Sequence, residues 1–118
     1  MSALHLIAAG LIVFAACFHS IMGERRLITP TLAADDPFIQ QPGTQAITRF
    51  GWHAASGFFL LTALAIVLPG TPAILIWATG GLWLVLGITN LIMLKAKHPG
   101  GPMLSLIGVL ILAGEYFQ

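Results

Sequence analysis

Histidine is the residue type in this sequence best suited to chemistry, and two of the four histidines are placed to act together. His19 lies near the end of one apolar segment, and His53 lies near the start of the next. If these segments form neighbouring antiparallel helices, the two imidazoles lie at a similar depth. Glu24 follows His19 by a little more than one helical turn, and His98 follows a later apolar segment. These four residues are the candidate functional set.

Two imidazoles on neighbouring helices are compatible with more than one kind of chemistry. His19 and His53 can ligate a haem iron from its two sides. Together with Glu24 and His98 they can form a site for a first-row transition metal. The metal signatures HExxH and ExxH do not occur in the sequence. Three interpretations therefore stay open for the set: packing between helices, haem or metal binding, and a proton or substrate role.

The remaining polar residues of the apolar segments are expected to pack helices. Asn90 and Arg49 are assigned this role, since a polar group in a membrane usually bonds to a neighbouring helix. His5 and Glu115 lie near the outer ends of the first and last segments. They can bond if those helices are neighbours, or they can lie separately in the headgroup region. Cys17, the single cysteine, is expected to be a small, buried and inert residue.

The elements that would position these residues are four long apolar segments. About 20 apolar residues are needed for a helix to cross the roughly 30 Å hydrocarbon core of a membrane. The segments are too long for strands and show no alternation of apolar and polar residues. They predict an all-α, integral membrane, up-down four-helix bundle that forms one domain over 1–118. The expected helices are 4–22, 50–68, 73–94 and 102–117, of which the last is the shortest, and the expected long cytoplasmic loop is 23–49.

Composition supports this fold class and limits the function classes. Of the 118 residues, 58% are hydrophobic and only 8% are charged, whereas about a quarter of the residues in soluble domains are charged. The net charge of +1 provides no clustered basic face for a nucleic acid. The expected partners are therefore the lipid bilayer and, through helix faces rich in small residues, other membrane subunits or a second copy of the chain.

The basic residues predict the orientation of the chain in the membrane. All five fall in, or beside, the first and third connections, and positively charged loops face the cytoplasm. The basic residues are Arg25, Arg26, Arg49, Lys95 and Lys97. The sequence thus predicts a multi-pass protein of the cytoplasmic (inner) membrane with both termini on the extracytoplasmic side. A cleaved signal is the alternative for segment 4–22, but no Lys or Arg precedes its apolar run.

The motif HSIMGERRL, which begins at His19, resembles a known pattern when it is taken with Arg49, Trp52 and His53 further on. It is similar to a group of small uncharacterised bacterial membrane proteins in which HSxxGE ends one helix and a WH pair begins the next. The resemblance covers roughly the first half of the chain and brings no known activity. It implies that His19, Glu24 and His53 belong to one constellation.

The leading functional hypothesis is a noncatalytic structural or accessory subunit in the membrane. In this hypothesis His19, Glu24 and His53 order the cytoplasmic face of the bundle, and no residue is assigned a catalytic role. One alternative is a haem or transition-metal protein that uses the same residues. Another is a small proton-coupled transporter, although the small multidrug transporters carry a carboxylate in their first helix and segment 4–22 has none.

Overall fold

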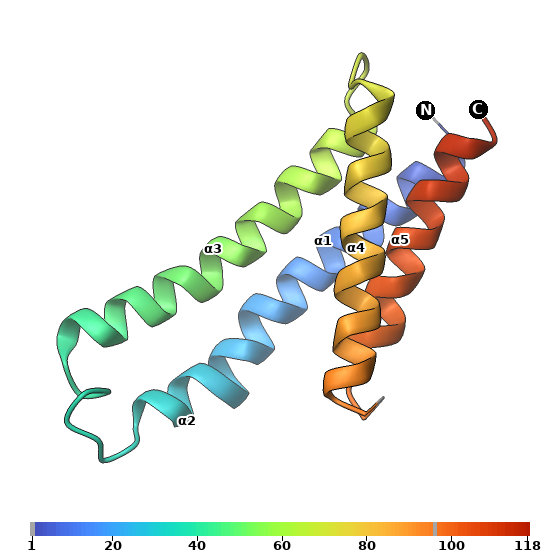
Figure 1. Ribbon diagram of the computed structural model, residues 1–118. Helices are drawn as coiled ribbons and strands as arrows, with labels where there is room; N and C mark the ends of the chain where they lie inside the picture. Colours follow the sequence, from blue (N-terminus) through green and yellow to red (C-terminus); the bar gives the residue numbers. More distant parts are fainter. Residues whose placement is uncertain (1, 96) are drawn as a thin grey trace. The chain divides into compact units, whose positions relative to one another are not determined.

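The computed structural model describes residues 2–95 and 97–118, and this part of the chain contains helices and short connections but no strand. The ribbon in Figure 1 confirms the predicted all-α fold class. The elements, in chain order, are α1 (Ala3–Gly23), the π-helical segment η1 (Glu24–Ile28), α2 (Thr29–Leu32), α3 (Pro42–Val67), α4 (Ala73–Met93) and α5 (Gly100–Tyr116).

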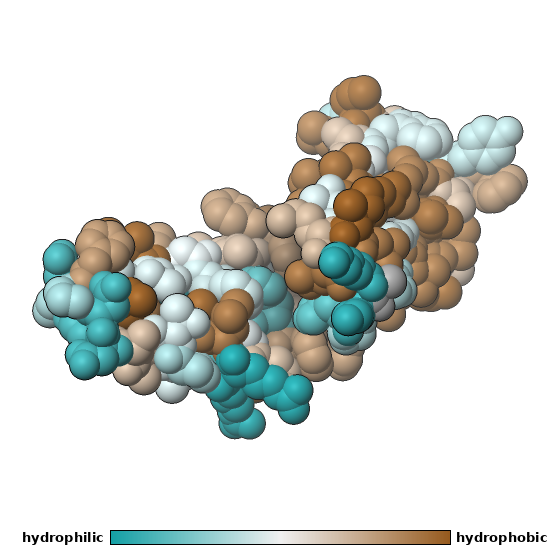
Figure 2. Space-filling view, turned by 60° about the horizontal axis from the view of Figure 1, so that its bottom comes forward, coloured by the Kyte–Doolittle hydropathy of each residue, from teal (hydrophilic) through white to brown (hydrophobic). Residues whose placement is uncertain are grey.

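Three helical stretches are long and apolar enough to cross a membrane. They are Ala3–Leu32, which joins α1, η1 and α2, followed by α3 and by α4. α5 is apolar but has 17 residues, fewer than the roughly 20 of a typical span. Figure 2 shows broad hydrophobic patches on the surface. Apolar surface of this extent is expected where lipid or another protein covers it.

The expected long loop 23–49 is the main difference between prediction and structure. The chain stays helical to Leu32 and is helical again from Pro42, so only 33–41 connects the helices. The prediction followed hydrophobicity, whereas backbone hydrogen bonds continue a helix through polar residues as well. Pro42 begins α3 without cost because the first turn of a helix has no partner for its N–H. The other predicted helix boundaries agree with the structure to within two residues.

The segment η1 widens the helix directly before a proline. The N–H of Thr29 donates to the carbonyl of Glu24, five residues back instead of the usual four. Pro30 follows, and in a regular α-helix its ring would press on the carbonyl of Arg26. The wider turn also brings the side chains of Glu24 and Thr29 to the same face, where they are hydrogen-bonded.

Contacts between residues divide the chain into two compact units. Unit 1 contains Met1–Ile12 and Leu61–Gln118, and unit 2 contains Val13–Leu60. The helices α1 and α3 each contribute one part to unit 1 and another part to unit 2. Each unit has its own packing and its own polar contacts.

In unit 1, α4 and α5 pack closely as an antiparallel pair through glycines (Figure 1). The glycines of this seam are Gly80, Gly87, Gly101 and Gly108. A Cβ added to Gly108 would lie 2.5 Å from the backbone nitrogen of Leu84, and one added to Gly87 would overlap the backbone of Ser105. Small residues let backbones approach, and this close packing is a main source of helix association in membranes.

The core of unit 1 is centred on Trp83. Its side chain is 1% exposed, and its indole N–H donates to the Thr62 hydroxyl at 3.0 Å. A buried indole needs such an acceptor. Ile107 and Ile111 of α5 are fully buried in the same unit.

In unit 2, the second part of α1 and the first part of α3 run antiparallel. Their contacts join rising residue numbers on α1 and η1 to falling numbers on α3, from His19 with Ser56 to Glu24 with Arg49. This register places the HSxxGE motif beside the segment that carries Trp52 and the second histidine.

Candidate functional site

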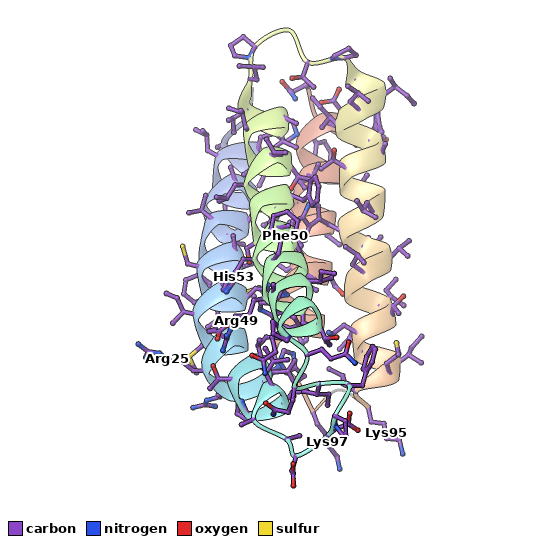
Figure 3. All side chains as sticks on the ribbon, turned by 90° about the vertical axis from the view of Figure 1, so that its left-hand side faces the viewer. Arg25, Arg49, Phe50, His53, Lys95 and Lys97 are labelled. Carbon is purple, nitrogen blue, oxygen red and sulfur yellow. The ribbon has the colours of Figure 1, made fainter. Side chains whose placement is uncertain are left out.

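The side chains that could carry chemistry in unit 2 form two neighbouring groups, one around Glu24 and one around His19, which together we call the polar cluster. Its members are His19, Ser20, Glu24, Thr29, Arg49, Trp52, His53 and Ser56. Figure 3 shows Arg49 and His53 one turn apart on the side of α3 that faces α1. The exposed fractions of the Glu24, Arg49 and His53 side chains are 26%, 46% and 43%, so the cluster is open to the surroundings of the protein.

Glu24 is the centre of the polar cluster because both of its carboxylate oxygens accept hydrogen bonds. Oε1 accepts from the Thr29 hydroxyl at 2.8 Å and from Nε of Arg49 at 3.0 Å. Oε2 lies 3.2 Å from Nε2 of His53. Bonds to a charged acceptor are stronger than neutral ones, so Glu24 fastens η1 both to α2 and to α3.

The contacts of Glu24 also lower the pKa of its carboxyl group. Glu24 follows the apolar stretch that ends at Met22 and lies outside it. The largest cause of the lowered pKa is the hydrogen bond from Thr29, and the hydrogen bond and positive charge of Arg49 act in the same direction. Each of these interactions favours the ionised form, so the carboxylate is charged at neutral pH.

His53 connects the carboxylate to a serine. Its Nδ1 lies 2.6 Å from the hydroxyl of Ser20, and its Nε2 faces Glu24. An ionised carboxylate can only accept hydrogen bonds, which assigns the proton of the neutral imidazole to Nε2. Nδ1 is then the acceptor, and the Ser20 hydroxyl donates to it.

His19 is packed between aromatic rings. Its ring is stacked on the indole of Trp52, with centroids 4.1 Å apart and planes 7° apart, and is tilted against Phe59. Its Nδ1 lies 2.9 Å from the hydroxyl of Ser56, and its carbonyl accepts a hydrogen bond from Nε1 of Trp52 at 2.9 Å. Both the side chain and the backbone carbonyl of His19 therefore connect α1 to α3.

Gly23 makes room for this arrangement. A Cβ at this position would overlap the indole ring of Trp52. The glycine of HSxxGE therefore has a steric explanation, since a larger residue would move the ring on which His19 stacks.

Three of the four residues in the candidate set come together. His19, Glu24 and His53 lie in the polar cluster of unit 2, whereas His98 belongs to unit 1, where its Nδ1 accepts a hydrogen bond from the N–H of Gly100 at 3.0 Å. Within residues 2–95 and 97–118, no group of three His, Cys, Asp or Glu side chains is arranged to hold a metal ion. The His19 ring is stacked on Trp52 and bonded through Nδ1, and both ring nitrogens of His53 have hydrogen-bond partners.

The two residues expected to pack helices have different surroundings. Arg49 donates to Glu24, as described above. Asn90 lies on α4, and its Oδ1 is buried with no hydrogen-bond partner among the described residues. The hydroxyl of Ser105 on α5 is in the same situation. Both atoms belong to unit 1, near the glycine seam.

His5 is far more buried than the sequence indicated. It is 1% exposed in unit 1, and its Nε2 donates to the carbonyl of Ile111 at 3.2 Å. The side-chain amide of Gln118 lies 3.4 Å from Nδ1, and the Glu115 carboxylate lies 4.0 Å from Nε2. Gly114 opens the space, because a Cβ there would come within 2.7 Å of the imidazole. Of the two alternatives for His5, contact with the last helix is the one observed.

The sequence pattern does not indicate the hydroxyl groups that bond to the histidines and to Glu24, and its prediction for the burial of Cys17 is wrong. Ser20, Thr29 and Ser56 were not singled out, although Ser56 follows His53 by three residues and so shares its helix face. Cys17 was expected to be buried, but its side chain is exposed on α1. The segment is apolar on all sides, so its sequence gives no indication of which face is covered.

Comparison of the chain with protein-family models, curated proteins and solved structures finds no match. The resemblance of HSxxGE and WH to small bacterial membrane proteins stays a prediction. The function is therefore argued from the polar cluster itself.

Proposed function

We propose that the protein is a multi-pass protein of the cytoplasmic membrane and that the polar cluster fastens α1 to α3. The supporting observation is the carboxylate of Glu24, which is bonded at once to Thr29, Arg49 and His53. The protein then serves as a structural or accessory component of the membrane. Its partners are the lipid bilayer and other membrane subunits or a second copy of itself.

A polar cluster of this kind is useful in a membrane because the helices are surrounded by lipid instead of water. Lipid tails are as apolar as leucine side chains, so apolar helices gain little from contact with each other rather than with lipid. Hydrogen bonds between helices and close packing of small residues must supply the specificity. The polar cluster supplies the first in unit 2, and the glycine seam supplies the second in unit 1.

The proposed orientation rests on the five basic residues. With Arg25, Arg49 and Lys97 on the cytoplasmic side, the connection 33–41 is also cytoplasmic. Residue 2, the turn at Gly70 and residue 118 then lie on the other side. The exposed Cys17 can be replaced by serine to give a background without cysteine.

Membrane extraction and cysteine labelling test this proposal. We expect the protein to stay in the membrane pellet after alkaline carbonate extraction. Single cysteines at Ser2 and Thr71 should react with an impermeant maleimide added to intact cells, and one at Asp36 should react only after permeabilisation. Release by carbonate would overturn the membrane assignment, and the reverse labelling pattern would overturn the orientation.

The haem and metal alternative has its own test. Protein purified in detergent should have no Soret absorbance and no stoichiometric metal if the polar cluster acts only in packing. A Soret band that disappears in both His19→Ala and His53→Ala would overturn the packing role in favour of haem ligation.

A further inference from the structure

We propose that Ser20 is a nucleophile activated by His53, and that the site transfers the acyl group of an ester. The inference goes beyond the structural role of the polar cluster and departs from the noncatalytic expectation. Only the substrate class rests on the proposed function, because it depends on placing the site at the membrane surface. The contacts of Ser20, His53 and Glu24 carry the rest.

Ser20, His53 and Glu24 form one line of hydrogen-bonded groups. The Ser20 hydroxyl lies 2.6 Å from Nδ1 of His53, and Nε2 of the same ring lies 3.2 Å from Oε2 of Glu24. A nucleophile in hydrogen-bond reach of a base, with the base oriented by a third group, is the signature of covalent catalysis by serine. The two ring nitrogens are used in the opposite order from the serine proteases, but either nitrogen can accept a proton.

One arrangement of the protons satisfies every hydrogen bond in this line. Glu24 accepts from Nε2–H, Nδ1 accepts from the Ser20 hydroxyl, and the serine oxygen keeps its lone pairs for an electrophile. If the serine only satisfied its own helix, its hydroxyl would bond to a backbone carbonyl one turn earlier. It is directed at the imidazole of α3 instead.

Glu24 is held in place by two neighbouring residues. Thr29 and Arg49 bond to Oε1 and leave Oε2 directed at His53. The widened turn of η1 positions Thr29 for this contact, and such widened turns occur frequently at functional sites. Glu24 is thus a positioning residue whose own orientation is fixed, as catalytic geometry requires.

The chain contains a second serine–histidine pair for comparison. Ser56 lies 2.9 Å from Nδ1 of His19, but Ser56 is 7% exposed and the His19 ring is covered by Trp52. No carboxylate is bonded to His19 in the described part of the chain. A substrate can reach His53, which is 43% exposed, so only the first pair is both oriented by an acid and accessible.

The surroundings of Ser20 indicate the substrate class. Ser20 lies just before the end of the apolar stretch at Met22, the depth at which headgroups meet acyl chains. Exposed apolar side chains flank the site, including Ile21 at 53% and Phe50 at 76%. An ester that joins an acyl chain to a polar group matches this boundary, with the chain along the apolar side chains and the ester at the serine.

The reaction needs only the ester and water. The Ser20 oxygen attacks the ester carbonyl while its proton passes to Nδ1 of His53, and the C–O bond to the alcohol breaks. The leaving alkoxide takes the proton from His53, which leaves an acyl ester on Ser20. Water, deprotonated by His53, then attacks this ester, and the carboxylic acid is released as Ser20 regains its proton.

A fluorophosphonate probe with an alkyl chain tests the nucleophile in detergent-purified full-length protein. We expect one phosphonyl group per chain, located on Ser20 by peptide mass spectrometry and absent in Ser20→Ala. His53→Gln should slow labelling roughly 100-fold, a typical loss for a general base. The control Ser105→Ala, on α5 in unit 1 and outside the polar cluster, should label at the wild-type rate. Hydrolysis of p-nitrophenyl laurate should follow the same order.

Glu24→Gln tests the positioning role of the carboxylate. In Glu24→Gln, labelling should slow roughly ten-fold or more, and kcat for p-nitrophenyl laurate should fall while KM stays unchanged, since Glu24 orients the base and does not contact the substrate. A merely structural Glu24 would change KM as well. Circular dichroism confirms that each variant is folded. Wild-type protein that is folded but unlabelled, or label that persists in Ser20→Ala, would overturn the nucleophile and leave the structural proposal intact.

Discussion

At the scale of single residues, the polar cluster depends on a glycine, Gly23, because this residue has no side chain. Gly23 leaves the volume that the Trp52 indole occupies, and Trp52 in turn stacks on His19 and donates to its carbonyl. The packing of Trp52 on Gly23, its stacking on His19 and its hydrogen bond to the His19 carbonyl therefore all depend on the absence of a Cβ at position 23.

Replacement of Gly23 by alanine should destabilise unit 2. The methyl group overlaps the Trp52 ring, and overpacking of this kind costs about 1–3 kcal/mol in the free energy of unfolding. SDS titration followed by circular dichroism measures the loss. Gly57→Ala is the matched control, since a Cβ there meets nothing within 4 Å. Equal stability of the two variants would contradict the steric role of Gly23.

Glu24 should make stability depend on pH in the acid range. Its pKa in the folded protein is below the ordinary value of 4.5, chiefly because of the Thr29 hydrogen bond. A lowered pKa contributes stability above the unfolded value, and this contribution is lost as the pH falls through the folded one. The difference in unfolding free energy between wild type and Glu24→Gln should therefore shrink below about pH 4.5. A difference between wild type and Glu24→Gln that stays flat across this pH range would contradict the role of the Glu24 contacts.

The residues that the sequence located correctly are those whose positions follow from helix register. His19, Glu24 and His53 come together because antiparallel neighbours place equal depths side by side. The burial of His5 could not be predicted in this way. It depends on which face of α5 the first turn of α1 meets and on the space beside Gly114, and neither is encoded in the local pattern around His5.

At the scale of elements, the α4–α5 pair shows how spacing becomes packing. Gly80 and Gly87 on one helix, and Gly101 and Gly108 on the other, each recur after seven residues, which is about two turns and so one face. The sequence predicts helix faces rich in small residues, but only the structure shows that these two faces meet. The lengths of the helices around 33–41 were underestimated because hydrophobicity marks membrane spans rather than helix ends.

Gly87→Ala should open this pair. The added Cβ meets backbone atoms of Ser105, which cannot move away by a side-chain rotation, so we expect a loss of about 2 kcal/mol or more in SDS titration. Gly81→Ala lies on the same helix, and its Cβ meets nothing within 4 Å. It should be neutral or slightly stabilising, because alanine favours a helix more than glycine does. A neutral Gly87→Ala would refute the close approach of the helices.

At the scale of the whole molecule, the chain is built from two units that share α1 and α3. Unit 2 consists of one continuous segment, Val13–Leu60, whereas unit 1 joins Met1–Ile12 to Leu61–Gln118. His5 and His98 lie in unit 1, His19 and His53 lie in unit 2, and the hydrogen bonds described for each histidine stay within its own unit. Disturbance of one unit should therefore be measurable in that unit first.

Replacement of His5 by alanine tests this division. The substitution removes the hydrogen bond from His5 to the Ile111 carbonyl and the contact between His5 and the Gln118 amide. Amide hydrogen exchange should therefore rise in peptides from α5. Peptides from 13–60 should keep their wild-type exchange. Leu6→Ala, at a position that is 53% exposed, is the matched control and should change neither. A uniform rise across both units would contradict the division.

The contact between His5 and α5 also has a consequence for biosynthesis. His5 and Gln118 are 113 positions apart, and all of unit 2 is translated between them. The polar cluster has every partner as soon as residue 60 has emerged, whereas the first turn of α1 must wait for α5. Ribosome-bound chains halted near residue 100 should already have the cluster protected from exchange while His5 is still open to chemical modification. Protection of His5 from modification in chains halted near residue 100 would contradict this order.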